Sequence, residues 1–238
     1  MDPIILASAS PRRQDFFRLM GLPFTCVPAM IDETPLPGLT PQQTAEELAR
    51  RKALAVADRL HSSTTTPHRP KAFDSGGDIH GASRCADLVN EHSLTLCSLE
   101  RPTPSPSPWI FAADTIVVLE NEIFGKPAGR DDARRMLERL AGRRHEVITA
   151  MALYNGQRKT VDCRSKTSEV AFAPLTGAEI EWYLDTGEWE GAAGAYRLQE
   201  LGACLIESIN GSPSGVAGVP LYELYAMLKD NGYPYGAW

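Results

Sequence analysis

The stretch WIFAADTIVVL, residues 109–119, is apolar along almost its whole length but carries one carboxylate, Asp114. Its β-branched and aromatic residues are typical of a buried strand, and Asn121-Glu122 predicts a turn into a short second strand ending near Phe124. A carboxylate inside an apolar strand needs a cation, a metal or strong hydrogen bonds. Asp114 is therefore a functional candidate, and a structural aspartate that caps nearby backbone is the alternative.

On both sides of this strand the sequence alternates between helical and extended patterns. Towards the C-terminus, two long strand patterns flank Asn155-Gly156, which predicts a hairpin. Towards the N-terminus, Ser10-Pro11 and the capping box Thr40-Pro41-Gln42-Gln43 are typical helix starts. This order predicts the α/β class, with helices packed on a mixed sheet. We expect further strands at 3–7, 24–28, 146–154, 160–172, 196–198 and 203–209, and helices at 11–20, 40–60, 131–140, 176–186 and 221–229.

Residues 61–108 interrupt this pattern with a low-complexity, proline-rich tract. Such composition cannot bury a core, so we predict a disordered insertion in a single domain that spans 1–238, with a marginal helix at 86–99 at most. The tract also contains His80, Cys85, His92 and Cys97, but their spacing does not match the usual zinc sites.

Composition excludes several classes of function. The 24 basic and 30 acidic residues give a net charge of −6, which argues against a nucleic-acid-binding module because phosphate backbones need a basic surface. The first residues do not resemble a secretory signal, and no apolar run is long enough to span a bilayer. An odd count of 5 scattered cysteines does not suggest a disulfide framework. We therefore expect a cytosolic protein without membrane or nucleic-acid partners.

The segment Ser8-Ala9-Ser10-Pro11-Arg12-Arg13 lies between a predicted strand and a predicted helix. The free N–H groups at a helix start bind anions, and the helix dipole favours negative charge there. Arg12 and Arg13 oppose that dipole unless an anion is bound, and the hydroxyls of Ser8 and Ser10 add donors. A triphosphate would satisfy all these groups. The alternative is a pair of solvated arginines on an exposed helix start.

Lys52 falls between Leu48 and Val56 in the apolar stripe of the 40–60 helix, which we expect to include Ala45, Ala49 and Ala55. A buried ammonium needs an anionic partner, unless the side chain reaches out to solvent. Glu33, after the second strand, and Lys126, in Gly125-Lys126-Pro127, are weak signals alone because charges in turns are usually solvated.

The segment 193–202 is rich in small residues, which permit close approach of the backbone to a ligand. Gln199 within it offers both a donor and an acceptor, the pair that matches the imide edge of uracil or thymine. A tight turn with a surface glutamine is the alternative.

Taken together, these segments resemble the Maf family of nucleotide pyrophosphatases. They occur in the family's order and cover nearly the whole chain outside 61–108. The resemblance implies a mixed α/β fold with two lobes around a cleft, related to inosine-triphosphate pyrophosphatases and often dimeric. The matching segments are Ala7 to Arg13, Asp32-Glu33, Arg51-Lys52-Ala53, Ala113-Asp114-Thr115, Gly125-Lys126-Pro127, Ala193 to Tyr196 with Gln199, and Val216 to Leu221.

The resemblance also implies a reaction: hydrolysis of a nucleoside triphosphate to monophosphate and pyrophosphate, with a divalent metal. Asp114 carries over as the proton acceptor, and Arg12, Thr115 and Gln199 as specificity positions. A glutamine at position 199 is typical of the members that act on dTTP and UTP. A modified or purine nucleotide and a non-catalytic regulator of septum formation are the alternatives.

In the mechanism we expect, Glu33 and Asp114 hold Mg²⁺ or Mn²⁺, because hard cations prefer carboxylate oxygens. Arg12, Arg13, Lys52 and Lys126 then stabilise charge on the leaving pyrophosphate. The sequence departs from the family at three places: Ala192, where many members have lysine, Glu200, where glycine is frequent, and the insertion at 61–108.

Overall fold

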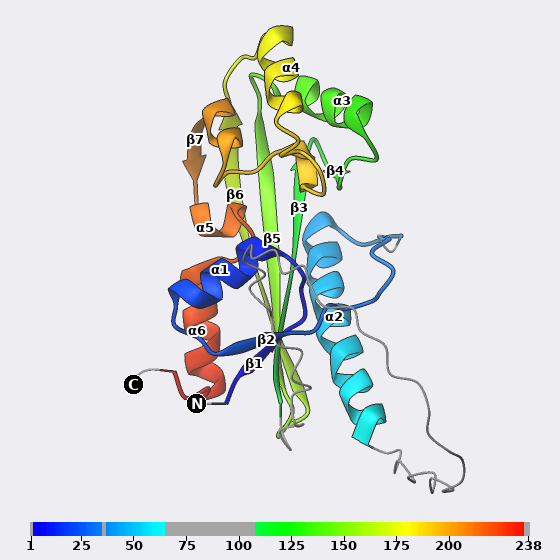
Figure 1. The fold of residues 1–238 in the computed structure, drawn as a ribbon, viewed down its shortest axis with the longest axis vertical. Helices are drawn as coiled ribbons and strands as arrows, with labels where there is room; N and C mark the ends of the chain where they lie inside the picture. Colours follow the sequence, from blue (N-terminus) through cyan, green and yellow to red (C-terminus); the bar gives the residue numbers. More distant parts are fainter. Residues whose placement is uncertain (1, 35–36, 65–107, 236–238) are drawn as a thin grey trace, which may run out of the picture.

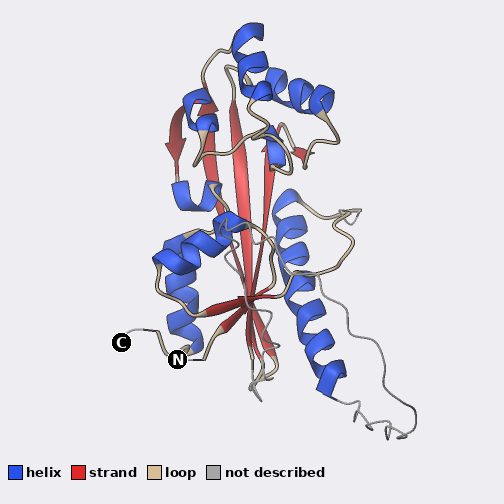
Figure 2. Ribbon diagram, viewed as in Figure 1, coloured by secondary structure: helices blue, strands red, loops and turns tan. Residues whose placement is uncertain are grey.

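The computed structural model describes residues 2–34, 37–64 and 108–235. The long strands at 109–119, 144–155 and 160–172 run through the length of the molecule, and helices pack on both sides of them (Figures 1 and 2). The predicted α/β class is therefore confirmed. The strands are β1 (Ile4–Leu6), β2 (Phe24–Cys26), β3 (Trp109–Leu119), β4 (Glu122–Phe124), β5 (Arg144–Asn155), β6 (Thr160–Phe172) and β7 (Ile206–Asn210). The helices are α1 (Pro11–Leu19), α2 (Pro41–Thr64), α3 (Arg130–Leu140), α4 (Gly177–Asp185), α5 (Pro213–Val216) and α6 (Leu221–Asn231), with 3-10 turns η1 (Ala193–Ala195) and η2 (Leu201–Leu205).

The sheet is mixed, as the sequence predicts. Its strand order is β2-β1-β3-β5-β6-β7, and β4 pairs with the upper end of β3. β1 runs parallel to β2 and β3, whereas β3, β5, β6 and β7 form an antiparallel succession. The β5–β6 hairpin pairs Asn155 with Thr160, so Asn155 closes the strand rather than standing inside the turn. Its side chain accepts the N–H groups of Gln157 and Arg158 and fixes the loop.

The lower part of the sheet is buried on both faces because successive side chains of a strand point to opposite sides. In β3, Ile110 and Ala112 pack under α2, whereas Phe111 and Ala113 pack under α1 and α6. This arrangement explains why β3 is almost continuously apolar instead of alternating between apolar and polar residues. For the same reason, the side chains of the consecutive polar residues Asp114 and Thr115 point to opposite faces of the sheet.

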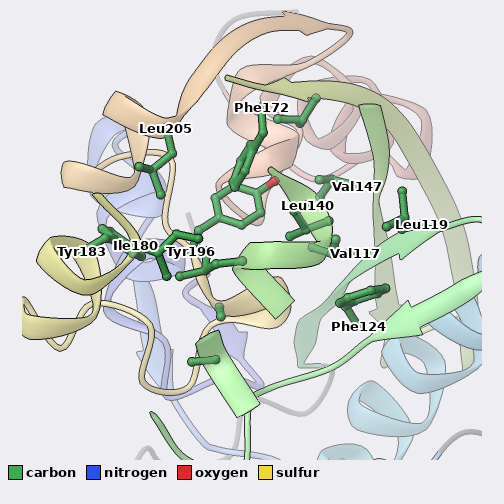
Figure 3. Packing of buried hydrophobic residues seen from close by; sticks show 14 of the residues in the cluster. Val117, Leu119, Phe124, Leu140, Val147, Phe172, Ile180, Tyr183, Tyr196 and Leu205 are labelled. Carbon is green, nitrogen blue, oxygen red and sulfur yellow. The ribbon is translucent and has the colours of Figure 1, made fainter. Parts of the chain in front are cut away.

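The upper part of the molecule has its own core, between the tops of the long strands and the layer of α3, α4 and the 3-10 turns (Figure 3). The capping box at Thr176 starts α4, with Glu179 accepting the Thr176 N–H at 2.7 Å. Phe172 and Tyr196 stack edge to face in this core, with ring centroids 4.8 Å apart.

Within the described ranges, no strand pairs with one edge of β3 between the two parts of the molecule. β1 pairs with this edge as far as Phe111, and β4 begins to pair at Val117. Asp114 and Thr115 lie in this interval of β3, between the upper and lower parts, or lobes, of the molecule. At this open edge, side chains that lie on opposite faces of the sheet can therefore approach the same region.

Several predicted elements differ in the structure. The strand predicted at 196–198 is wrong, because these residues form loop and turn, and the one predicted at 203–209 begins at Ile206 after the 3-10 turn η2. Tyr196 and Leu198 pack into the upper core from loop and turn, without pairing with a strand. Ala55 is only partly buried, whereas Ala53 and Ala57 complete the stripe of α2.

The predicted insertion at 61–108 lies mostly outside the described residues. Helix α2 continues to Thr64, so the first four positions of that tract, 61–64, are helical rather than irregular. The marginal helix at 86–99 and the four residues His80, Cys85, His92 and Cys97 fall outside the described ranges. Among the described residues, none of the helices combines the length and the apolar character that a bilayer crossing requires.

Candidate functional site

A cleft of about 530 Å³ opens at the unpaired edge of β3. Residues from both lobes surround it, including every position that the sequence singles out for phosphate or metal binding. Such a concave, partly polar cavity is the expected form of a small-molecule site. Its lining residues are 7–13, 28–29, 33, 52, 114–115, 117, 126, 147, 190–191, 193, 196–197, 200 and 216–218.

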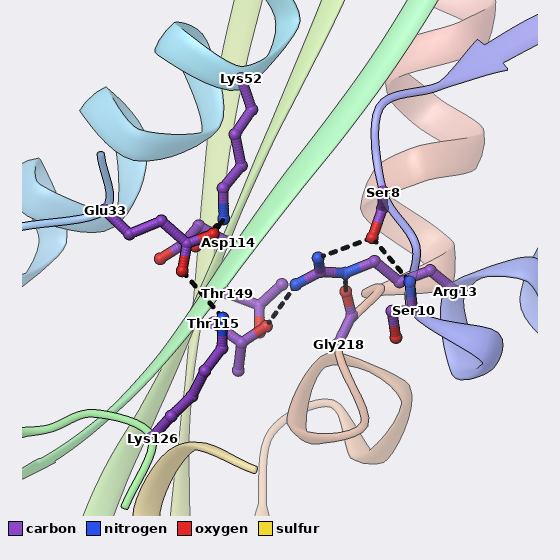
Figure 4. Close-up of polar contacts among 10 residues, drawn as sticks. All are labelled: Ser8, Ser10, Arg13, Glu33, Lys52, Asp114, Thr115, Lys126, Thr149 and Gly218. Carbon is purple, nitrogen blue, oxygen red and sulfur yellow. Dashed lines mark hydrogen bonds and ion pairs between the residues drawn. The ribbon is translucent and has the colours of Figure 1, made fainter. Parts of the chain in front are cut away.

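Four charged residues alternate in sign along one side of the cleft (Figure 4). Lys52 Nζ lies 2.6 Å from Asp114 Oδ1 and 2.8 Å from Glu33 Oε1, and Lys126 Nζ lies 2.8 Å from Glu33 Oε2. Lys52 and Asp114 are both buried and pair with each other, so the Lys52 ammonium meets a carboxylate instead of reaching out to solvent. Both residues therefore stand at the cleft with an oppositely charged partner, and their functional role stays a prediction.

The other two charged residues of this cluster, Glu33 and Lys126, lie outside the helices and long strands. Asp32 accepts the Thr34 N–H at 2.9 Å and the Thr34 hydroxyl at 2.6 Å, which fixes the turn that carries Glu33. Lys126 follows β4, and the neighbouring Gly125 carbonyl accepts the Gly194 N–H at 3.1 Å. The close approach that Gly194 allows is therefore to the protein's own backbone and to Val117, since a Cβ at Gly194 would lie 2.8 Å from Val117 Cγ2.

Glu33 is held in its ionised form. Partial burial favours the neutral carboxyl, but hydrogen bonds from Lys126 and Lys52, together with their charges, outweigh it and lower the pKa of Glu33 to about 2. A carboxylate that is ionised at neutral pH and faces a cleft can exchange an ammonium partner for another cation without first losing a proton.

Arg13 lies on the other side of β3 and is held from three directions (Figure 4). Its Nε donates to the Gly218 carbonyl at 3.3 Å, Nη1 to the Ser8 hydroxyl at 3.3 Å and Nη2 to the Thr115 hydroxyl at 3.4 Å. Burial lowers the pKa of Arg13, while Asp114 and Glu33 act in the opposite direction. The guanidinium is thus fixed beside the carboxylates before any ligand binds.

Arg12 and Arg197 add positive charge at the cleft. Burial lowers the pKa of Arg12, and the nearby charges of Arg197 and Arg13 lower it further. Arg197 donates to the Glu190 carbonyl at 2.6 Å and lies 3.4 Å from Glu200. Cationic side chains that repel one another in this way favour an anionic ligand.

The start of α1 also faces the cleft. Ser10 occupies the N-cap position, but its side chain makes no capping hydrogen bond, and its own N–H donates to the Ser8 hydroxyl at 3.2 Å. Pro11 is the first helical residue, as the sequence predicts, and Asp and Glu are absent from the first turn of α1. This helix start is therefore available to an anion.

Gln199 is the predicted site residue that the structure leaves outside the cleft lining. It is exposed in the turn after Arg197, whereas Arg197 and Glu200 line the cleft. Sequence reasoning missed Arg197 as a contributor, although it lies in the same quoted segment. It also missed Thr149, which is buried under Thr115 and has no local signal because it resembles any strand threonine.

The donor set is compatible with one hard divalent cation. Within the described ranges, no three His, Cys, Asp or Glu side chains gather as a complete metal cage. Glu33 and Asp114, however, converge on one point, since the same Lys52 ammonium contacts both. Two carboxylates that leave room for phosphate oxygens are a common Mg²⁺ arrangement.

Comparisons with known proteins agree with this geometry. The family model described as Maf-like protein matches residues 3–231. A dTTP/UTP pyrophosphatase of Symbiobacterium thermophilum is 36% identical over 234 residues, 98% of this chain and 96% of that protein. A dTTP/UTP pyrophosphatase of Halalkalibacterium halodurans is 37% identical over 234 residues, 98% of each chain, and one of Pseudoalteromonas atlantica is 37% identical over 228 residues, 95% of each chain. The chain therefore belongs to the Maf family.

Proposed function

We propose that this protein hydrolyses nucleoside triphosphates to nucleoside monophosphate and pyrophosphate, with dTTP and UTP as its preferred substrates. The observation that carries the proposal is the convergence of Lys52, Asp114 and Glu33 with Arg13 beside the open edge of β3. The relatives named dTTP/UTP pyrophosphatases, which match over nearly the whole chain, support both the reaction and the pyrimidine preference.

The chemistry needs a base, an anion site and charge neutralisation. Asp114 accepts a proton from the water whose oxygen attacks the α-phosphorus. The bond from that phosphorus to the bridging oxygen breaks, and pyrophosphate leaves with the bonding electrons. Arg13, Lys52 and Lys126 stabilise the charge that develops on it. Arg12, Ser8 and Ser10 bind phosphate oxygens at the start of α1.

Glu33 and Asp114 are the residues that would hold a Mg²⁺ or Mn²⁺ ion. When bound, the metal would neutralise phosphate charge and polarise the α-phosphorus. Lys52 now occupies the position between the two carboxylates, so we propose that its ammonium turns towards a phosphate when metal and nucleotide enter. Thr115 and Gln199 remain proposed base-selecting positions, together with Arg12.

A substrate panel tests this function. Purified protein is incubated with dTTP, UTP, CTP, 7-methyl-GTP or ITP and Mg²⁺, and monophosphate and pyrophosphate are quantified by ion-exchange chromatography. We expect stoichiometric release of both products, with the highest kcat/KM for dTTP and UTP, and loss of turnover when EDTA removes the metal. Release of inorganic phosphate instead of pyrophosphate contradicts the reaction. A preference for 7-methyl-GTP or ITP contradicts the pyrimidine assignment, and no turnover of any nucleotide favours the non-catalytic regulator.

We also propose that the protein acts on free nucleotides in the cytoplasm and forms a homodimer, as the family resemblance implies. Size-exclusion chromatography with light scattering tests the assembly directly. A mass of about twice the 26.0 kDa chain supports the dimer, and a mass near that of one chain contradicts it.

A further inference from the structure

Behind Arg13, two hydroxyl groups and one carbonyl group form a chain of hydrogen bonds that is partly buried at Thr115 and fully buried at Thr149. Arg13 Nη2 donates to Thr115 Oγ1 at 3.4 Å, Thr115 Oγ1 lies 2.9 Å from Thr149 Oγ1, and Thr149 Oγ1 donates to the Gly215 carbonyl at 2.7 Å. Thr149 stands directly opposite Thr115 in the β3–β5 register and is 0% exposed (Figure 4). Thr115 lines the cleft, whereas Thr149 is not among the lining residues.

The direction of every hydrogen bond in this chain is determined. A carbonyl oxygen can only accept, so Thr149 commits its single hydroxyl hydrogen to Gly215. Thr149 must then accept from Thr115, whose own hydrogen is thereby also committed. Thr115 Oγ1 can therefore only accept a further hydrogen bond, and it accepts one from Arg13 Nη2. In water or in an apolar setting, a threonine hydroxyl would rotate freely between donating and accepting roles.

This fixed polarity matters because Arg13 is a pure donor. A Thr115 hydroxyl that pointed its hydrogen into the cleft would repel the guanidinium and compete for phosphate oxygens. We propose that Thr149 is a positioning residue, which holds Thr115 as an acceptor and thereby aims Arg13 at the phosphates of the substrate. This inference rests on the proposed function for its substrate, and the residues that carry it come from β3, β5 and the start of α1.

The test compares Thr149→Val, which keeps the shape and removes the hydroxyl, with Thr149→Ser, which keeps the hydroxyl. We expect Thr149→Val to lower kcat/KM for UTP by about ten-fold, because one hydrogen bond to a charged partner loses its support. We expect Thr149→Ser to keep at least half of the wild-type kcat/KM for UTP, because its hydroxyl is retained. Thr167→Val on β6, an exposed strand threonine away from the cleft, is the matched control and leaves kcat/KM unchanged.

A double-mutant cycle separates positioning from a general packing effect. If Thr149 acts through Thr115, the loss on Thr149→Val disappears in a Thr115→Val background, and the two effects are strongly non-additive. Full additivity in kcat/KM, or a Thr149→Ser enzyme as impaired as Thr149→Val, overturns the proposal. Thermal unfolding of each variant identifies losses that come from reduced stability.

The same variants distinguish this inference from the proposed function. An active wild type with an unimpaired Thr149→Val contradicts the positioning role alone. If wild-type protein hydrolyses no nucleotide, the proposed function fails, and the comparison is made by calorimetric binding of inorganic tripolyphosphate. Weaker binding by Thr149→Val, restored by Thr149→Ser, then supports the positioning role, and equal binding by all three proteins overturns it.

Discussion

Asp114 and Thr115 are neighbours in the chain but belong to two different clusters. Strand geometry points Asp114 towards α2, where it meets Lys52, and Thr115 towards α1, where it meets Arg13. The open edge of β3 lets both clusters line one cleft. A one-residue shift in the register of β3 would exchange these partners, and Asp114 would then face the buried threonine instead of the ammonium.

At the residue scale, Asp114→Asn tests the proton acceptor. The amide preserves size but cannot take a proton, so we expect pyrophosphate release to fall by about 10²–10⁴-fold with little change in fold. Circular dichroism and thermal unfolding check the fold, and Asp131→Asn, an exposed position on α3, serves as the control. Near-wild-type turnover by the pure Asp114→Asn variant would rule out the base assignment.

Glu33 makes stability depend on pH. The folded-state pKa of Glu33, about 2, lies below the ordinary glutamate value of 4.5, so the ionised carboxylate stabilises the folded protein above pH 4.5 and loses this contribution as pH falls towards 2. We expect the Tm advantage of wild type over Glu33→Gln to be constant near neutrality and to shrink between pH 5 and pH 2. Calorimetry at several pH values measures it, and an advantage that does not change over this range contradicts the ion-pair interpretation.

At the scale of elements, α2 carries Lys52 into the cleft. The capping box starts the helix, with Thr40 Oγ1 accepting the Gln43 N–H at 3.2 Å and Gln43 Oε1 accepting the Thr40 N–H at 3.0 Å. Ala45, Ala49 and Ala53 then allow α2 to pack closely on the sheet. This close packing brings the ammonium of Lys52 to Asp114 on the neighbouring strand.

Thr40→Ala removes the side-chain acceptor at the start of α2. We expect a loss of about 1 kcal/mol in the free energy of unfolding, which corresponds to a Tm lower by about 2–4 °C for a protein of this size. Thr40→Ser keeps the acceptor and should retain the wild-type Tm within a degree or so. Equal losses in the two variants would mean that packing of the threonine methyl group, rather than the cap, is responsible.

At the scale of the whole molecule, long strands connect two lobes that have separate cores. β3, β5 and β6 run through both lobes (Figure 1). Residues of both lobes line the cleft. The two ends of the chain close the lower lobe. Tyr233 is 0% exposed, packs edge to face on Trp109 with centroids 5.5 Å apart, and donates to the Asp2 carbonyl at 2.8 Å.

Tyr233 therefore gives a test of how the chain ends contribute to stability. Tyr233→Phe should cost about 1 kcal/mol through the lost hydrogen bond, and Tyr233→Ala about 3–5 kcal/mol through the cavity it leaves. Urea unfolding measures both. Tyr222→Phe, at a position that is 77% exposed, is the control and should change nothing. A loss below 1 kcal/mol in Tyr233→Ala would mean that the ends are not part of the cooperative fold.

Local patterns were sufficient to predict most elements and most of the charged residues that line the cleft, although not Arg197. The capping box at Thr40, the burial of β3 and the place of Lys52 in the apolar stripe depend on residues a few positions apart, so they can be read directly from the chain. The short strand predicted at 196–198 failed, because pairing depends on a partner that the local sequence does not specify.

Only the tertiary structure decided which of these groups meet. The contact of Lys52 with Asp114 spans 62 positions and that of Thr149 with Gly215 spans 66, and both depend on strand order and register. Strand order and register also leave one edge of β3 unpaired among the described residues. The fold likewise places Arg197 in the lining of the cleft and Gln199 outside it. The physical reason is that a side chain's type reflects its own burial, whereas its partners are fixed by packing of distant segments.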